Sequence, residues 1–190
     1  MGTVLVRRWT RQEYDRMVEA GVFPPGERVE LIDGEVLAMT PQGSAHATAL
    51  LLAEDALRKA FDAGTHVRVQ LPLALDPSSE PEPDVTVVRG SPRDYRDAHP
   101  SAALLVVEVA DTTLPYDREQ KGSLYARAAV ADYWIVNLVD RVLEVYRDPG
   151  PLSQSRYGWG YRTVEHYSAG ESVSPLASPH ARVPVADLLP

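Results

Sequence analysis

The chain predicts an α+β fold: one mixed β-sheet flanked by a few helices, with an additional helix and hairpin near the N-terminus. Apolar residues at helical spacing alternate along the chain with strand-like runs, in the order helix, hairpin, helix, strands, helix, strands. The 16 prolines and 12 glycines among 190 residues favour short strands joined by many turns over a helical bundle.

Three segments predict helices. The capping-box pattern Thr10-Arg11-Gln12-Glu13 begins a helix that runs to about residue 20. Residues 44–61 repeat apolar side chains at helical spacing and predict the clearest helix of the chain. A third helix is expected from about residue 117 to 129, with Lys121 on its inward stripe.

Asp33-Gly34 between two alternating runs predicts a two-residue hairpin of residues 28–32 and 35–39. Alternation places Glu30 on the same face as Ile32, which is unusual if that face is buried. Further strands are expected at residues 65–71, 84–88, 104–109, 133–136, 142–146 and 161–167. Because residues 104–109 are almost wholly apolar, they predict a central strand that is covered on both faces.

The length predicts a single domain over residues 1–190. Its core would span about residues 10–148, and residues 149–190 would add a strand and a proline-rich tail of little structural weight. With no cysteine, disulfides and thiolate chemistry are excluded. The chain has no signal-peptide pattern and no membrane-length apolar run, so we expect a soluble cytoplasmic protein. A net charge of −8 argues against broad nucleic-acid affinity, though not against a local basic groove.

Two carboxylates interrupt apolar strands. Asp84 follows Pro83 at the start of one strand, where a plain acidic residue at the surface is the alternative interpretation. Glu108 lies between Val107 and Val109 in the most apolar run of the chain. Because a lone buried carboxylate is costly, Glu108 is predicted to have a partner or a function.

Lys121 lies in the first turn of the third predicted helix, where its ammonium group could reach the strand ends. Taken alone, it reads as an ordinary solvated lysine. Together with Asp84 and Glu108, it suggests a site for Mg²⁺ or Mn²⁺, which prefer oxygen ligands. Such a site suits hydrolysis of a phosphodiester.

An ordered series of segments carries a family resemblance. It consists of Val29-Glu30-Leu31-Ile32-Asp33-Gly34-Glu35-Val36, Met39-Thr40-Pro41 with His46, Glu82-Pro83-Asp84-Val85, Val107-Glu108-Val109, Tyr116-Asp117-Arg118-Glu119-Gln120-Lys121 and Asp132-Tyr133-Trp134-Ile135-Val136. The chain resembles the bacterial Uma-two family of restriction-endonuclease-like proteins, within the PD-(D/E)xK nuclease superfamily. The match spans about residues 10–146.

The resemblance implies a nuclease core of the order αβββαβ. It implies a metal ion held by Asp84, Glu108 and the carbonyl of Val109, with Lys121 as the catalytic lysine. Glu30 would be an additional acidic residue at the site, which gives a reason for its unusual inward position.

The chain departs from the family pattern in three places. The superfamily's usual lysine, two positions after the glutamate, is Ala110 here, so catalysis depends on Lys121 reaching the site. Asp111-Thr112-Thr113 replaces a turn of the Ser-Pro-Ser-Thr kind. Asn137 stands in place of a usual aspartate, a change interpreted as structural.

Two further polar residues are candidates for substrate binding. His46 is interpreted either as a phosphate contact or partner of the site, or as a helix-entry residue with a local hydrogen bond. Gln70 is interpreted either as a residue that positions water or as an ordinary polar residue at the end of a strand. The aromatic residues of the C-terminal region could stack on bases or, alternatively, cover the sheet or form a dimer surface.

The first functional hypothesis is a Mg²⁺-dependent DNA endonuclease that acts as a homodimer, since two copies suit the cutting of two strands. The second is a non-catalytic module with a nuclease fold, which the acidic charge balance favours. A third is hydrolysis of a smaller phosphate compound.

Overall fold

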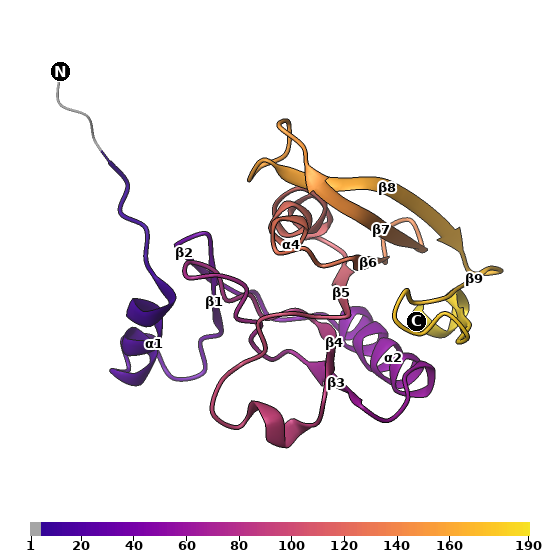
Figure 1. The fold of residues 1–190 in the computed structure, drawn as a ribbon, viewed down its shortest axis with the longest axis horizontal. Coiled ribbons are helices and arrows are strands. Elements are labelled where there is room, and N and C mark those ends of the chain that lie inside the picture. The colour runs from indigo at the N-terminus through magenta and orange to yellow at the C-terminus, as the bar shows by residue number, and fades with distance from the viewer. Residues whose placement is uncertain (1–4) are drawn as a thin grey trace.

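The computed structural model describes residues 5–190, and a six-stranded mixed sheet lies at its centre (Figure 1). The strands follow the order β3-β4-β5-β6-β7-β8 across the sheet. Their bounds are β3 (Thr65–Val69), β4 (Val85–Arg89), β5 (Leu105–Ala110), β6 (Asp132–Asn137), β7 (Val142–Pro151) and β8 (Trp159–Ser168). In this sheet β5 and β6 are parallel, and each other neighbouring pair is antiparallel. The predicted α+β fold is confirmed.

A helical crossover joins the two parallel strands, as parallel pairing requires. It consists of α3 (Leu114–Tyr116), a π-helical turn (Asp117–Lys121) and α4 (Gly122–Arg127). The helix therefore begins three residues before the predicted start and ends two before the predicted end. With α2 (Ser44–Ala60) before β3, the elements follow the αβββαβ order that the resemblance implies.

The two faces of the sheet carry different cores. On one face, Val107 and Trp134 pack against α2, the longest helix of the described chain. On the opposite face, Val106 and Tyr133 pack against α4 with Tyr125. This division follows from strand alternation, because successive residues of a strand point to opposite faces. Within residues 5–190, no helix meets the length and hydropathy needed to cross a membrane.

The C-terminal segment completes the core on the α2 face, so the expectation that it carries little structural weight is wrong. β9 (Ser172–Val173) and β10 (Val183–Pro184) pair with each other, and a 3₁₀ turn follows at Val185–Leu188. Val185 and Leu188 are fully buried beside α2. The sequence does not predict this packing, because prolines are frequent in the segment and its apolar residues follow no regular helical or strand pattern.

The N-terminal unit has a small core of its own. It consists of α1 (Arg11–Glu19), with its predicted capping box, and a hairpin of β1 (Val29–Ile32) and β2 (Glu35–Ala38). Asp33 and Gly34 have φ angles of 47° and 80°, the left-handed values that a two-residue hairpin turn needs.

The hairpin forms a separate two-stranded sheet and docks beside the central one (Figure 1). Backbone hydrogen bonds join Leu31 and Glu80 in both directions, at 2.7 and 3.3 Å. Arg127 of α4 adds ion pairs to Asp33 and Asp76, at 2.8 and 2.9 Å. Docking buries all four residues of β1, which is why both of its faces carry apolar side chains.

Replacing Leu188 by alanine is expected to lower the free energy of unfolding by about 2–5 kcal/mol, because it leaves a cavity in the core. Urea denaturation measures this change. The matched control is Leu176→Ala, since Leu176 is 49% exposed in the same segment. Equal denaturation midpoints for the two variants would contradict the structural role of the tail.

Candidate functional site

Asp84 and Glu108 lie directly opposite each other on neighbouring strands. The register pairs Val85 of β4 with Val107 of β5, so the next residues along the two antiparallel strands are Asp84 and Glu108. Both side chains are buried on the α4 face of the sheet. The backbone amide of Asp84 donates to Glu108 Oε2 at 3.3 Å. The strand register thus brings together the two carboxylates that the sequence singled out.

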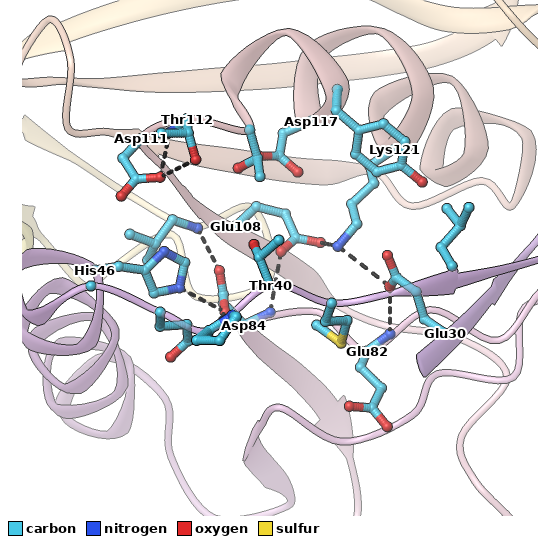
Figure 2. A pocket seen from close by; sticks show the side chains of 18 of the residues that line it. Glu30, Thr40, His46, Glu82, Asp84, Glu108, Asp111, Thr112, Asp117 and Lys121 are labelled. Atoms are coloured by element: carbon cyan, nitrogen blue, oxygen red, sulfur yellow. Dashed lines mark hydrogen bonds and ion pairs between the residues drawn. The ribbon is translucent and has the colours of Figure 1, made fainter. Parts of the chain in front are cut away.

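Lys121 reaches this pair from the crossover helix (Figure 2). Its Nζ donates to Glu108 Oε1 at 3.0 Å and lies 3.5 Å from Glu30 Oε2. The helix lies over β5 because it connects β5 to its parallel neighbour. An extra residue in the π-helical turn changes the direction of the side chains that follow, and such turns are frequent at functional sites. The lysine therefore comes close to Glu108 although Ala110 occupies the usual lysine position.

Glu30 enters the site from the docked hairpin. Its Oε2 accepts a hydrogen bond from the backbone amide of Glu82 at 3.1 Å and faces Lys121. Only 4% of Glu30 is exposed. Its inward position, unusual for a strand in isolation, results from contact with the segment that leads into β4.

Four groups contact the carboxylate of Asp84, among them Gln42 Nε2 at 3.5 Å from Oδ1. His46 Nε2 and Gln70 Nε2 each lie 3.2 Å from Oδ1, and the backbone amide of Val109 donates to Oδ2 at 2.9 Å. His46 therefore contacts the site rather than making only a local bond at the helix entry. Gln70 has a φ of 48°, a conformation that non-glycine residues seldom adopt and that is enriched at functional sites.

The structure adds residues to the site that were not singled out in the sequence. Asp117 is buried in the π-helical turn and accepts a hydrogen bond from Thr113 at 2.7 Å. The hydroxyl of Tyr125 donates to Glu108 Oε1 at 2.6 Å. A signal existed for Asp117, because it lies four residues before Lys121 on the same helix. For Tyr125, nothing in the local sequence identifies Glu108 as the partner of its hydroxyl.

Burial disfavours the charged form of Glu108 and raises its pKa to about 8. Lys121 opposes this increase, and the nearby carboxylates of Asp84 and Asp117 add to it. For Lys121, burial favours the neutral amine, but Glu108 and Glu30 outweigh that effect and raise its pKa well above the ordinary value. The lysine is consequently a cation at neutral pH.

Two further carboxylates of the site, Asp84 and Asp117, differ in their acidity. Burial would raise the pKa of Asp84, but the hydrogen bond and charge of His46 outweigh burial and lower it. Burial raises the pKa of Asp117 to about 6, although Lys121 opposes the increase. The site therefore contains a strongly ionised carboxylate beside two that retain protons more readily.

Except for Gln70 and Tyr125, these side chains line a cavity of about 490 Å³ (Figure 2). One wall is formed by β2 and the segment that follows it, and the other by residues from the end of β5 to the π-helical turn. The carboxylates that line the cavity are Glu30, Glu82, Asp84, Glu108, Asp111 and Asp117. The cationic or potentially cationic residues that line it are Lys121 and His46. An excess of negative charge therefore faces the cavity.

The structure limits the local basic groove that the sequence allowed. Arg68 is buried, and Arg118 forms an ion pair with Glu144 at 2.5 Å. Tyr161, one of the aromatic residues considered for base stacking, is buried beside Tyr133. Asn137 has a structural role, since its side chain bonds both Glu144 and the turn that follows β6.

A mixed sheet with this core order, and carboxylates converging at neighbouring strands, defines the class of nuclease-like α+β proteins. The model of the Uma2 family, described as "Putative restriction endonuclease", matches residues 11–186. The chain belongs to this family, which confirms the resemblance inferred from the sequence.

A solved structure supports the same fold. It is the crystal structure of "a putative nuclease belonging to DUF820" from Anabaena variabilis ATCC 29413, which is similar with a TM-score of 0.64 and 16% sequence identity. The match covers 90% of this chain and 96% of the other. No curated protein matches the chain.

Replacing Lys121 by methionine is expected to raise the pKa of Glu108 above about 8, because the substitution removes the nearby positive charge that favours the carboxylate. Titration of the Glu108 carboxyl carbon by NMR, without divalent metal, measures this change. Lys59→Met, at an exposed position of α2, is the control. A Glu108 pKa near the ordinary value of about 4.3 in the Lys121 variant would disprove the coupling.

Proposed function

We propose that this protein is a metal-dependent endonuclease that hydrolyses phosphodiester bonds of DNA. The observation that carries the proposal is the convergence of Asp84, Glu108 and Lys121 in one acid-lined cavity. The family description supports a nuclease and DNA as its substrate.

The donor set fits a hard divalent cation. Asp84 and Glu108 offer carboxylate oxygens, and the Val109 carbonyl is the proposed third ligand. Within residues 5–190, no three Asp, Glu or His side chains are grouped closely enough to hold an ion by themselves. Two carboxylates and a carbonyl oxygen suit Mg²⁺ or Mn²⁺, because Mg²⁺ commonly binds one or two carboxylates and keeps several waters.

When bound, the ion would polarise a phosphoryl oxygen and lower the pKa of an attacking water. Lys121 is proposed to stabilise negative charge that develops on the phosphate, or to orient the water as a hydrogen-bond donor. Its raised pKa argues against a role as general base, because the amine retains its proton. Glu30 would hold the ammonium group in place from the side opposite Glu108.

His46 and Gln70 are proposed to orient Asp84 through their bonds to Oδ1. With Val109 bonded to the other oxygen, the carboxylate has a defined direction before substrate binds. A defined direction is useful because catalytic groups contribute most when they need little rearrangement during the reaction.

The homodimer stays a prediction. A measurement of the molar mass of the protein in solution tests it.

A non-catalytic module is the competing function. It is favoured by the ion pairs that occupy Lys121 and by the few free cations around the cavity. A nuclease needs positive charge to attract phosphates, and a bound metal ion would have to supply part of it. Cleavage assays on DNA, alongside a screen of small phosphate esters, separate these functions.

Asp84→Asn is expected to reduce cleavage of duplex DNA by at least about 100-fold, because an amide is a weaker metal ligand and carries no charge. Gel analysis of a plasmid incubated with Mg²⁺ or Mn²⁺ measures the rate. Lys121→Met should cause a loss of similar size.

The matched control for this experiment is Asp97→Asn, since Asp97 lies in an exposed loop outside the cavity and pairs with Arg96. It should cleave like the wild type. Equal cleavage by all of these proteins would indicate a contaminating nuclease and remove support for the proposed function.

The affinity for Mg²⁺ is expected to rise by up to about tenfold per pH unit until about pH 8, and to level off above that value. The reason is that Glu108, whose pKa is raised to about 8 by burial, must lose its proton before its carboxylate binds the ion. Calorimetric titration in buffers of different ionisation enthalpy measures both affinity and proton release. Glu108→Ala should abolish binding, and pH-independent affinity in the wild type would contradict the assignment.

A further inference from the structure

The cavity lies between two walls, with the proposed metal site at its floor. The first wall is formed by residues 37–43 and the second by residues 109–117. At the floor, Asp84, Glu108 and Lys121 are each between 3% and 6% exposed. A phosphate that reaches the floor must therefore enter between the walls. The exposed residues at the edges of the two walls are residues 40–43 and 112–113.

The space between the walls suits a ligand about the size of one nucleotide. It measures about 490 Å³, and cavities of roughly 300–1,000 Å³ bury most of the surface of a small organic molecule. In a continuous duplex, each nucleotide is stacked and paired. Moving one into an enclosed pocket costs free energy, and that cost is smallest for a strand that is already unpaired. The size and depth of the cavity thus favour an unpaired strand.

The first wall offers an apolar surface that a base can lie against. Leu37, Met39 and Pro41 line the cavity on this side, and the neutral polar residues Thr40 and Gln42 lie beside them. Bases taken out of a duplex are commonly held against apolar or aromatic side chains and bonded at their edges. In a continuous duplex the faces of the bases are covered by stacking, so only an unpaired nucleotide can use this surface.

The charge of the walls points in the same direction. Neither wall contains an arginine or a lysine, and Arg118, the next residue after the second wall, is paired with Glu144. Proteins bind duplex DNA largely through cations that contact its phosphates, and a duplex carries one charge per about 1.7 Å of its axis, twice the density of one strand. Because six carboxylates line the cavity, a duplex would be repelled more strongly than a single strand.

We propose that the cavity admits one nucleotide of an unpaired DNA strand, with its base against the first wall and its phosphate at the floor. The protein would then cleave single-stranded DNA in preference to a continuous duplex, which would be cleaved slowly where base pairs open. This inference rests on the proposed function, and it names the form of DNA that the site accepts. Cleavage is the hydrolysis already proposed, in which water supplies hydroxide to phosphorus and a proton to the leaving ester oxygen.

One labelled oligonucleotide, used alone and annealed to its complement, tests the proposal. With Mg²⁺ or Mn²⁺, kcat/KM for the single strand should exceed that for the duplex by at least about tenfold, because the duplex must first release a nucleotide from its stack. A duplex with an unpaired internal loop should be cleaved in the loop. Equal values for the single strand and the fully paired duplex, or a higher value for the duplex, would overturn the proposal.

A variant tests whether the base lies against the first wall. Met39→Ala removes an apolar side chain from this wall, so kcat/KM for the single strand should fall about tenfold. The control is Met17→Ala, since Met17 packs against the small core of the N-terminal unit, outside the cavity. That variant should keep its kcat/KM, and urea unfolding checks that both variants are folded. A folded Met39 variant with the kcat/KM of the wild type would show that the base lies elsewhere.

A binding measurement separates this proposal from the proposed function. Fluorescence anisotropy of each labelled form, with Ca²⁺ in place of Mg²⁺, reports binding without requiring cleavage. If the wild type binds the single strand at least about tenfold more tightly than the duplex but cleaves neither, the endonuclease proposal fails and the placement of an unpaired strand is supported. If both forms are bound and cleaved equally, only the proposal about the unpaired strand fails. If neither form is bound or cleaved, both proposals fail.

Discussion

The carboxyl group of Glu108 lies at the centre of the most apolar strand of the sheet, and the arrangement around it is a response to that burial. A buried carboxylate without partners would be strongly destabilising, and the partners must come from elements other than its own strand. The crossover helix provides Lys121 and Tyr125, and the neighbouring strand provides the amide of Asp84. Even with these partners the pKa of the group is raised, so its compensation is incomplete.

The incomplete compensation for the burial of Glu108 relates the structure of the site to its proposed chemistry. Glu30, Asp84, Glu108 and Asp117 face one buried lysine, and the hydrogen bonds of Asp84 are arranged to keep that group ionised. Apolar side chains of similar size at these positions would often make the folded protein more stable. Under the proposed function, the acidic groups that are ionised favour binding of a cation, which relieves the repulsion among them. Substrate and cation would then each strengthen the binding of the other.

Local chemistry explains which parts of this structure the sequence predicts. The capping box at Thr10, the hairpin turn at Asp33-Gly34 and the strand around Glu108 depend on residues close together in the chain. The convergence of Asp84 with Glu108 was also predictable, because each residue is out of place in an apolar strand.

The remaining features depend on packing between distant segments. The burial of Leu188 requires α2, and the partner of the Tyr125 hydroxyl lies 17 residues away on another element. The π-helical turn has no local signature, because a single extra residue fits the same helical pattern.

The crossover helix has a consequence for how such sites diverge among related proteins. A lysine two residues after a glutamate on one strand has a constrained spacing, because inserting a single residue would turn it to the other face. Lys121 is positioned by the packing of α4 on the sheet, with the turn at Asp111-Thr112-Thr113 between it and Glu108. The residues of this turn are largely exposed, so a turn of another length would be compatible with the same packing of the helix. In this architecture, topology constrains the order of the site residues along the chain. It does not fix the number of residues between the glutamate and the lysine.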